Sequence, residues 1–506
     1  MADTPASRTT RTTSLSVLVP VYNERYLVQD SLRRLRVLGE SPLLDRVQVI
    51  VVDDASRDQT ALALEHFQQM LRVEPWGPKF EWKFLRHEQN RGKGGALRTA
   101  LAEADCYLCV FHDADLEYHP RDLLRMIPLF LEEDADAVYG SRFLVGGFHR
   151  VLFFRHYLGN RLLTFLCDFV SDLNITDMET CYKMVRTPLL KSIPIESNDF
   201  RIEPELTIKL GKRNARIFEV PISYSGRTYL EGKKIGWKDG VKALLAILRF
   251  AISDHLYTPD TYGSQILERM NRAPRFTRWM ADTVRPYVGE RVLEIGAGTG
   301  SMTRHLLPRT LVWAADVNPL HLRVLHRMTQ TIPYLRVKQV DIARPETFPD
   351  ESKFDSVLCL NGIEHVADDV AALRNLRHVL DDAGRIIVLV PQGPGLYGSL
   401  DEVLGHHRRY TRQQLVDAGE RAGLRAVRVL KFNRSSVPAW WVNGRLLRKR
   451  KFGYVQMKVL NLLVPVLRVV DRWIPLPPLS LIAVFEKADE KQVPSAAETP
   501  AAAAAR

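Results

Sequence analysis

The sequence predicts an α/β protein with two doubly wound domains in tandem. Short apolar segments alternate with segments of helical periodicity, and this alternation runs through the chain twice. The chain has 506 residues, which suits two to four domains of roughly 100–200 residues each. A composition of 46% hydrophobic and 26% charged residues is typical of a globular protein and excludes a disordered one.

The first block of alternating elements begins with an apolar strand at 16–20. Strands separated by helices in this way predict a parallel sheet. After the first strand we expect strands at 49–53, 82–86 and 106–112, helices at 58–71 and 93–104, and a closing amphipathic helix at 237–256.

The second block begins with a strand at 291–295 and shares the architecture of the first block but not its sequence. We expect helices at 301–307, 319–329, 368–380 and 411–422, and strands at 311–316, 335–340, 354–360, 385–390, 425–430 and 480–485.

These blocks predict the domain boundaries. Residues 1–14 form a polar tail, 15–256 the first domain, 257–287 a linker, 288–487 the second domain and 488–506 an alanine-rich tail. The N-terminus has no apolar segment of the signal-peptide kind, and no uncharged apolar stretch reaches 18 residues. We therefore expect a cytoplasmic protein whose membrane contact, if it has one, is peripheral and on the cytoplasmic face.

The five cysteines exclude a disulfide scaffold, and Cys106 and Cys109 lie in an apolar run typical of a buried strand, so we expect core thiols there. The net charge of +12 favours an anionic partner: nucleic acid, nucleotide, phospholipid or a phosphorylated substrate. Composition alone does not distinguish among these.

In the first block, polar residues follow the carboxyl ends of the predicted strands. This is the edge at which an open parallel sheet binds its ligand. Segments 19–24 (VPVYNE) and 51–56 (VVDDAS) each close a strand, and 90–95 (NRGKGG) opens a helix. Glycines permit close approach, Lys93 adds positive charge, and a helix N-terminus favours phosphate. The glycine stretch matches neither a P-loop nor G-x-G-x-x-G, so it is weak evidence by itself.

The segment 112–117 (HDADLE) is the sharpest signal. Asp113, Asp115 and Glu117 alternate, so an extended segment would direct all three carboxylates to one side. Converging carboxylates repel each other unless a hard divalent cation such as Mg²⁺ or Mn²⁺ joins them, and such an ion also binds a diphosphate. The alternative is a solvated acidic loop.

Taken together, these motifs resemble family 2 glycosyltransferases of the GT-A nucleotide-sugar fold, in particular the polyprenyl-phosphate sugar synthases, over residues 16–250. The resemblance implies a nucleotide-sugar donor and assigns two groups of residues. The nucleotide would contact Pro20, Tyr22, Glu24, Asp53 and Asp54, and the metal would be held by Asp113, Asp115 and Glu117.

Downstream residues extend the resemblance. Arg142 and Arg155 resemble phosphate-binding arginines, segment 176–183 an acceptor-side element, and Arg227 and Lys233 a basic pair near the donor diphosphate. The metal and cations would stabilise the leaving diphosphate in an inverting displacement. A polyprenyl phosphate acceptor needs arginines but no base, whereas a hydroxyl acceptor needs a general base, for which Asp177 and Glu179 are the candidates.

The second block carries three glycines, at 296, 298 and 300, between a strand and a helix. The following strand ends at Asp316, where a carboxylate can bind a ribose diol, and the next two strands end near Asp341 and Asn361. An NAD-binding domain is the alternative, but there the acid follows the glycines, whereas here Glu294 precedes them.

This pattern resembles Rossmann-like class I S-adenosylmethionine methyltransferases over residues 288–487. The resemblance implies that Glu294, Gly296, Gly298 and Gly300 hold the methionine end, Asp316 the ribose and Asp341 the adenine, and that Asn361 lines the sulfonium. Methyl transfer requires mainly alignment. An oxygen acceptor also needs a base, for which the candidates are Glu364, His365 and segment 405–410.

The densest basic run, 445–451, follows Trp440 and Trp441 and precedes an amphipathic segment, 459–470, which Pro465 is expected to break. Basic residues beside tryptophan suit an anionic membrane surface, as does segment 151–170 with Arg155 and Arg161. The alternative for the run is a solvated helical cap. No nucleic-acid recognition motif accompanies the charge.

The sequence therefore predicts a bifunctional glycosyltransferase and methyltransferase. Two alternatives stay open: transfer of sugar to a glycan or metabolite hydroxyl, with the methyltransferase modifying the same product, and an RNA-binding modifier whose first domain is degenerate.

Overall fold

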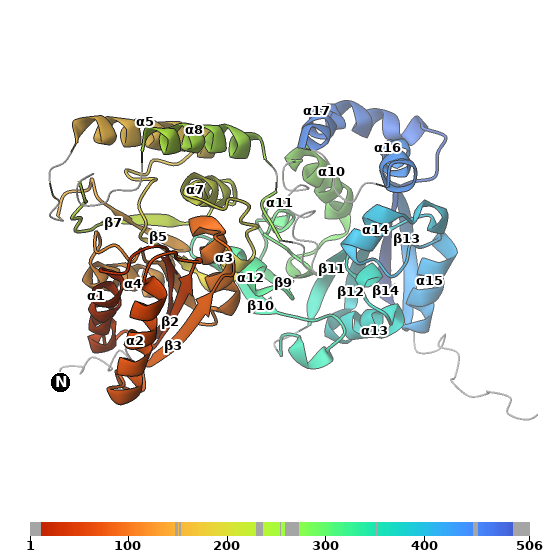
Figure 1. The fold of residues 1–506 in the computed structure, drawn as a ribbon. Helices are drawn as coiled ribbons and strands as arrows, with labels where there is room; N and C mark the ends of the chain where they lie inside the picture. The colour runs from red at the N-terminus through yellow and green to blue at the C-terminus, as the bar shows by residue number, and fades with distance from the viewer. Residues whose placement is uncertain are drawn as a thin grey trace, which may run out of the picture. The chain divides into compact units, whose positions relative to one another are not determined.

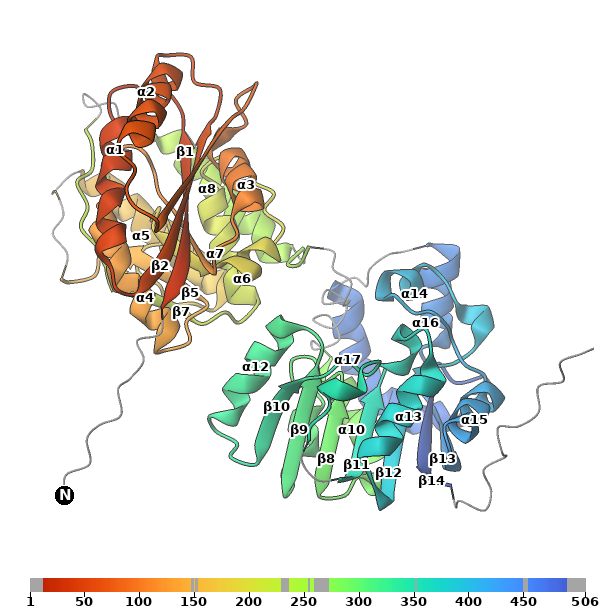
Figure 2. The same cartoon turned by 90° about the horizontal axis from the view of Figure 1, so that it is seen from below.

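The computed structural model describes residues 12–146, 150, 153–228, 236–253, 255–258, 273–350, 353–448 and 454–488. The chain divides into two compact units, Met1–Thr258 and Pro259–Arg506, and each contains one sheet of seven strands (Figures 1 and 2).

The sheet of the first unit has the strand order β3-β2-β1-β4-β6-β5-β7. Its central strands are apolar and almost completely buried, as expected where helices cover both faces. One strand, β6, runs antiparallel to both neighbours. The strands are β1 (Thr13–Val21), β2 (Leu44–Asp53), β3 (Phe80–Arg86), β4 (Leu108–Phe111), β5 (Ala137–Ser141), β6 (Lys183–Arg186) and β7 (Ile217–Pro221).

Helices cover both faces of this sheet, and Figure 2 shows α1 (Val28–Arg34) and α2 (Thr60–Val73) opposite α3 (Gly92–Glu103). A further layer consists of three helices that contact one another: α5 (Phe154–Ser171), α7 (Ile202–Lys212) and α8 (Trp237–Ile252) (Figure 1). The other helices of this unit are α4 (Leu123–Leu131) and α6 (Thr187–Lys191).

The sheet of the second unit has the order β10-β9-β8-β11-β12-β14-β13, in which β14 runs antiparallel to both neighbours. Side chains alternate between two cores on its two faces: Val292 lies in one and Leu293 in the other. The strands are β8 (Arg291–Ile295), β9 (Leu311–Asp316), β10 (Leu335–Gln339), β11 (Phe354–Leu360), β12 (Leu380–Pro391), β13 (Leu424–Phe432) and β14 (Ser480–Lys487).

The helices of the second unit also lie on both faces of its sheet (Figure 2). They are α10 (Pro274–Val284), α11 (Thr303–Leu306), α12 (Pro319–Thr329), α13 (Asp369–Val379), α14 (Ser399–Leu404), α15 (Arg412–Arg421), α16 (Val437–Trp441) and α17 (Tyr454–Val470).

The expected class, two doubly wound α/β domains, is confirmed, and three local expectations are corrected. Residues 274–287, expected to be linker, form α10 and a 3-10 turn, because Phe276 and Trp279 bury themselves against Phe432. Pro465 lies inside α17 rather than ending it. The helix expected at 301–307 is a single short turn, α11.

All five cysteines are buried and unpaired, which agrees with the expected core thiols at Cys106 and Cys109. Among the described helices, none is both long and apolar enough to cross a membrane. The tails expected at 1–14 and 488–506 lie almost wholly outside the described residues.

Candidate active sites

In the first unit, Asp53 and Asp54 stand at the carboxyl end of β2, where the sequence places them. Asp53 accepts a hydrogen bond from the Ser56 N–H and lies 3.3 Å from the Arg86 guanidinium. The Asp54 carboxylate instead accepts bonds from the N–H groups of Arg91 (2.8 Å) and Gly92 (2.7 Å). Asp54 therefore fixes the path of the glycine loop, and its expected contact with the nucleotide stays a prediction.

The glycine loop packs against protein, which corrects the expected phosphate cradle. A Cβ on Gly94 would lie 2.2 Å from the Ser197 carbonyl oxygen, and one on Gly92 would lie 2.3 Å from that of Asn198. The N–H groups of Gly94 and Gly95 donate to that same Asn198 carbonyl. Because the first turn of α3 is satisfied in this way, the glycines serve close backbone packing.

Two of the three carboxylates of segment 113–117, those of Asp115 and Glu117, lie beside one arginine. Leu116 has φ +63°, so the segment turns and is not the extended strand that the alternation suggested. Arg227 Nη2 lies 3.1 Å from Asp115 and its Nε 3.3 Å from Glu117. Glu24, from the loop after β1, lies 3.6 Å from the same guanidinium. Three carboxylates from two loops thus share one cation.

In the part of the chain that the structure describes, the carboxylate oxygens of Asp113, Asp115 and Glu117 do not all come within 4.8 Å of one another. Their chemistry nevertheless fits a hard divalent cation. Burial raises the pKa of Asp115 to about 7, and the neighbouring Asp113 and Glu117 carboxylates add to the rise. A second positive charge would relieve this repulsion, and oxygen ligands are those that Mg²⁺ and Mn²⁺ prefer.

A buried chain of charges connects this segment to the acceptor-side element. Lys93 lies 2.9 Å from Asp113 and 3.0 Å from Glu203, whose other oxygen lies 2.6 Å from Lys183. Burial by itself would lower the pKa of Lys93, but Asp113 and Glu203 raise it well above its ordinary value. Glu203 was not among the residues predicted from the sequence, although a glutamate among apolar residues of α7 is a signal of a buried partner.

Arg142 and Asp177 form a buried bidentate pair, with Arg142 Nε and Nη2 each 2.7 Å from an Asp177 oxygen. Arg142 lowers the pKa of Asp177, so this carboxylate is a positioning group and a poor base. Glu179 differs: burial, followed by the Glu203 carboxylate, raises its pKa to about 7. Its Oε1 atom is buried without a hydrogen-bond partner.

The other expected residues of this unit divide into three groups. Pro20 is the penultimate residue of β1, and Tyr22 and Glu24 follow the strand at the same edge of the sheet. Arg155 is exposed on α5, which does not support its expected phosphate contact. Lys233 lies outside the described residues.

The second unit contains a cavity of about 840 Å³ at the carboxyl ends of its parallel strands. Eight of the residues expected at this site line the cavity: Gly296, Gly298, Asp316, Asp341, Asn361, His365, and His406 and Arg409 from segment 405–410. The apolar wall of the cavity was not predicted, although the spacing of Phe276, Trp279 and Met280 is typical of a helix. This wall includes Phe276 and Met280 of α10, Phe432 of β13, and Met457, Leu460 and Leu467 of α17.

Two expected contacts are corrected. Glu294 does not line the cavity: its carboxyl group accepts a hydrogen bond from Thr303, and burial raises its pKa to about 7. Gly300 also lies off the wall, and a Cβ there would lie 2.6 Å from the Met328 sulfur. Glu294 and Gly300 therefore support the glycine turn from the side that faces away from the cavity.

Asp316 repeats in this unit the role of Asp54. Its Oδ2 accepts from the Gly298 N–H (2.8 Å), and its Oδ1 accepts from the Asn318 N–H (2.8 Å) and from His321 (3.1 Å). Gly298 has φ +58°, a conformation that glycine adopts without strain. The glycine turn is therefore held open toward the cavity.

Comparisons with known proteins assign a family model to each of the two units. Residues 16–193 match the model of glycosyl transferase family 2, and residues 293–386 match that of a methyltransferase domain. The chain joins a family 2 glycosyltransferase domain to a methyltransferase domain.

Two relatives of the glycosyltransferase domain are named for lipid-phosphate acceptors. A UDP-N-acetylglucosamine–dolichyl-phosphate N-acetylglucosaminyltransferase of Methanococcus voltae is 24% identical over 215 residues, which cover 41% of this chain and 83% of the relative. A dolichyl-phosphate beta-glucosyltransferase of Dictyostelium discoideum is 26% identical over 234 residues, covering 44% and 68%.

Two solved structures are also similar. Glucosyl-3-phosphoglycerate synthase from Mycobacterium tuberculosis, in complex with Mn²⁺, uridine diphosphate and phosphoglyceric acid, has a TM-score of 0.36 and 19% identity, covering 47% of this chain and 78% of its own. An S-adenosylmethionine-dependent methyltransferase from Clostridium acetobutylicum has a TM-score of 0.29 and 12% identity, covering 43% and 92%.

The Arg142–Asp177 pair gives a test of the glycosyltransferase domain. Arg142→Met leaves Asp177 buried and uncompensated, so we expect a loss of about 3–5 kcal/mol in the free energy of unfolding of this domain. Adding Asp177→Leu should restore much of it. The control, Arg33→Met, removes an exposed pair with Asp30 and should cost about 0–1 kcal/mol. Denaturant unfolding measures all three, and equal losses for Arg142→Met and Arg33→Met would contradict the interpretation.

Proposed function

We propose that the protein is a bifunctional enzyme. The glycosyltransferase domain transfers a sugar, with inversion, from a nucleotide-sugar to a polyprenyl phosphate with the help of Mg²⁺ or Mn²⁺. The methyltransferase domain transfers a methyl group from S-adenosylmethionine to an acceptor with an apolar body.

The observation that carries the first activity is the cluster around Arg227. Asp113 and Asp115 would hold the metal, which supplies positive charge for the departing diphosphate. Arg227 lies within 3.6 Å of Glu24, Asp115 and Glu117 and neutralises part of their charge. When a metal ion neutralises these carboxylates instead, Arg227 is placed to bind the same diphosphate. Asp53 and Tyr22, at the neighbouring strand ends, suit the nucleoside.

The names of the relatives support a lipid phosphate as the acceptor. Such an acceptor is already anionic and needs no general base. A second candidate, a hydroxyl acceptor, is favoured by Glu179, the buried carboxyl group whose pKa is raised to about 7 and which has an unpartnered oxygen. A base of that pKa can take a proton from a hydroxyl at neutral pH.

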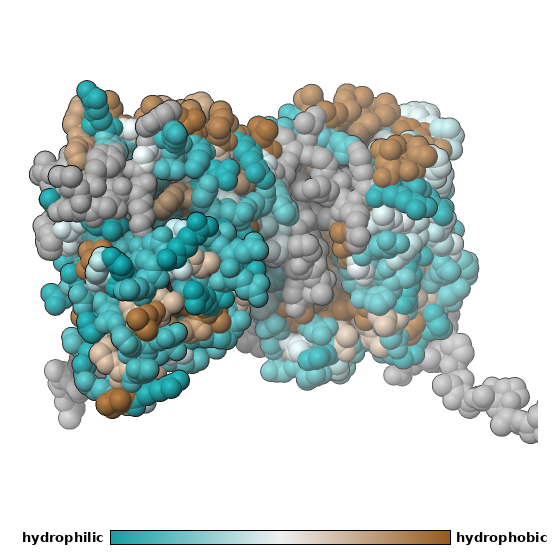
Figure 3. Space-filling view, in the orientation of Figure 1, coloured by the Kyte–Doolittle hydropathy of each residue, from teal (hydrophilic) through white to brown (hydrophobic). Residues whose placement is uncertain are grey.

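Exposed apolar side chains of α5 and α8 support a peripheral contact with an anionic membrane. Figure 3 shows hydrophobic residues gathered over these two helices. Exposed basic residues lie on the same two helices, among them Arg161, Lys242 and Arg249, and they suit acidic headgroups. The apolar residues are Phe154, Leu158, Leu162, Phe165, Phe169, Val241, Leu245, Leu248 and Ile252.

For the methyltransferase domain, the cavity carries the proposal. Gly296 and Gly298 form an open turn, and Asp316 and Asp341 lie at successive strand ends. The cavity continues beyond these polar residues between α10 and α17, where its walls are apolar. Helix α17 lines the cavity with Leu460 and exposes Leu462 and Val466 on its other side. An acceptor with an apolar body fits this extension.

Asp115→Asn tests the glycosyltransferase activity. It removes a metal ligand and should reduce Mn²⁺-dependent transfer from a UDP- or GDP-sugar at least about a hundredfold, because charge on the leaving group is then poorly stabilised. Asp105→Asn, which changes an exposed aspartate paired with Arg46, is the control. Full activity of Asp115→Asn would refute the proposed metal site.

Glu179→Gln separates the two acceptors. With a hydroxyl acceptor, the wild-type rate should rise with pH through about 7, as Glu179 loses its proton, and the variant should lose about 10²–10⁴-fold. With polyprenyl phosphate, the rate of the variant should stay close to wild type, and no pH rise near 7 should depend on Glu179. Initial rates between pH 5.5 and 8.5 with both acceptors decide between them.

Binding of S-adenosylmethionine to the full chain, measured by calorimetry, tests the second activity. Asp341→Ala removes a carboxylate from the cavity wall and should weaken binding about tenfold to a hundredfold. Asp381→Ala, an exposed residue of β12, should leave binding unchanged. No binding to the wild-type chain would overturn this half of the proposal.

Sedimentation with vesicles containing anionic lipid tests the membrane contact. Phe165→Asp and Leu245→Asp each place a charge in the apolar face and should weaken binding at least about tenfold. Leu62→Asp alters an exposed leucine on α2, away from these two helices, and is the matched control. Unchanged vesicle binding by Phe165→Asp and Leu245→Asp would contradict the proposed membrane contact of this apolar face.

A further inference from the structure

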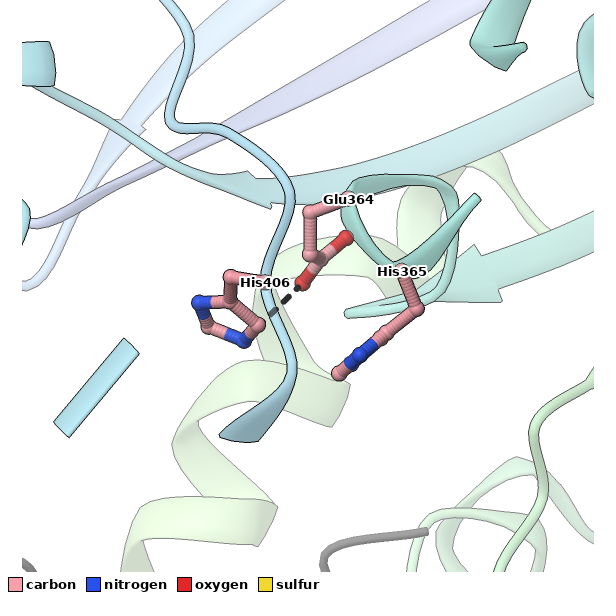
Figure 4. A group of neighbouring side chains, drawn as sticks. All are labelled: Glu364, His365 and His406. Carbon is pink, nitrogen blue, oxygen red and sulfur yellow. Dashed lines mark ion pairs between the residues drawn. The ribbon is translucent and has the colours of Figure 1, made fainter. Parts of the chain in front are cut away.

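Three potential metal ligands meet at the carboxyl end of β11, beside the methyltransferase cavity. Glu364 and His365 lie on the 3-10 turn Ile363–His365, and His406 follows α14. One ligand atom from each lies within 4.8 Å of the others. Figure 4 shows the two imidazole rings on either side of the Glu364 carboxyl group. Two of the three, His365 and His406, line the cavity.

Glu364 is completely buried, and neither of its carboxyl oxygens has a hydrogen-bond partner. Burial raises the pKa of Glu364 to about 8. A buried polar group without a partner costs about 1–3 kcal/mol, and more when it is charged. The fold therefore retains an unfavourable side chain directed at two histidines, which points to a ligand that satisfies it.

A neighbouring carboxylate fixes the orientation of His406. Asp401 Oδ1 lies 2.8 Å from His406 Nδ1, so the ring proton is held on that nitrogen. The lone pair of Nε2 then faces Glu364 Oε1 at 4.0 Å. Two acceptors facing each other do not attract, but a cation between them is bound by both. A carboxylate behind a ligating histidine is the usual second partner in metal sites.

The local charges favour a cation as well. Asp401 is neutralised by Arg409, whose Nε lies 2.8 Å away and whose Nη1 donates to the Gln392 carbonyl oxygen. Arg408, from the same loop, pairs with Asp369 at 3.1 Å. Among the described residues, the His406 ring is the one cationic group within ion-pair distance of Glu364, and Arg409 acts on this carboxyl group from farther away. A cation bound beside Glu364 would compensate its charge directly.

We propose that Glu364, His365 and His406 bind one divalent transition-metal ion, with zinc the best match. Two imidazoles and one carboxylate form a known catalytic zinc set that leaves the fourth position open. Bonds of about 2.1 Å place tetrahedral ligands about 3.4 Å apart, so small side-chain rotations close the present spacing. Because His365 and His406 line the cavity, the open position faces it.

This placement suggests a role that rests on the proposed methyltransferase activity, whereas the metal site itself does not. An acceptor hydroxyl bound at the open position would release its proton to solvent more readily. Its oxygen would then form the bond to the methyl carbon, and the electrons of the broken carbon–sulfur bond would remain on sulfur, giving S-adenosylhomocysteine.

Calorimetric titration of the chelator-treated full chain with ZnCl₂ tests the site. We expect one tight site per chain in wild type, and a loss of affinity of at least about tenfold in Glu364→Gln and His406→Ala. His407→Ala removes an exposed neighbouring ring and should bind as wild type does. Repeating the titration in Asp115→Asn excludes a contribution from the carboxylates of the glycosyltransferase domain.

Binding of S-adenosylmethionine is measured on the same samples. If the variants still bind S-adenosylmethionine, they are folded, and their loss of zinc affinity then supports the metal site. If the wild-type chain does not bind S-adenosylmethionine, the proposed methyltransferase activity is refuted but the metal site is not. Asp401→Asn should weaken zinc about tenfold to a hundredfold by releasing the His406 ring. Zinc binding that is absent, or equal in wild type, Glu364→Gln and His406→Ala, would overturn the proposal.

If the variants fail to fold, Co²⁺ added to the wild-type chain provides an independent test. Visible absorption bands typical of four- or five-coordinate Co²⁺, abolished by one equivalent of zinc, support the site. Only the weak absorption of octahedral Co²⁺ would overturn it.

Discussion

In each domain, one aspartate at the carboxyl end of a parallel strand organises the neighbouring site. Asp54 directly follows β2, and Asp316 is the last residue of β9. Asp54 holds the N–H groups of Arg91 and Gly92, and Asp316 holds that of Gly298. Each also binds a histidine, His87 at 2.7 Å and His321 at 3.1 Å. Charge-assisted bonds to backbone N–H groups are strong and directional, so one carboxylate sets the path of an entire loop.

The two domains use the loop held in this way differently. In the glycosyltransferase domain the glycines seat α3 against the backbone at 197–198, which brings Lys93 to Asp113 and Glu203. In the methyltransferase domain the glycine turn faces an open cavity, and a Cβ on Gly296 would meet no atom within 4 Å. The same residue type therefore serves packing in one site and ligand access in the other.

Buried charge is the recurring cost of both sites. Lys183 and Glu203 are buried, Lys93 is nearly so, and such a network is stable only while every member has its partner. Glu179 and Glu364 are exceptions, each with a buried carboxyl oxygen that lacks a partner and a raised pKa. Natural folds keep few such groups, and these two stand at the sites where chemistry is expected.

All seven strands of the second unit and strands β1 to β4 of the first could be predicted, because buried parallel strands are nearly continuous apolar runs. Strands β5, β6 and β7 of the first unit were not predicted. The helix at 274–284 was missed because no strand pattern surrounds it and its burial depends on Phe432, which is distant in sequence. The antiparallel direction of β6 and β14 could not be predicted, since direction depends on which neighbours a strand meets.

The sequence by itself determined the two-domain α/β class, the strand ends that carry Asp113, Asp115, Asp316 and Asp341, and the families to which the motifs belong, because these follow from local pattern and spacing. Only the tertiary structure decided what each charged side chain meets. It paired Asp54 with a loop, Asp177 with Arg142 and Asp401 with His406, and it left Oε1 of Glu179 and both carboxyl oxygens of Glu364 buried without a hydrogen-bond partner. The reason is physical: a carboxylate's role depends on its burial and on partners brought from distant segments, and neither is written in the local sequence.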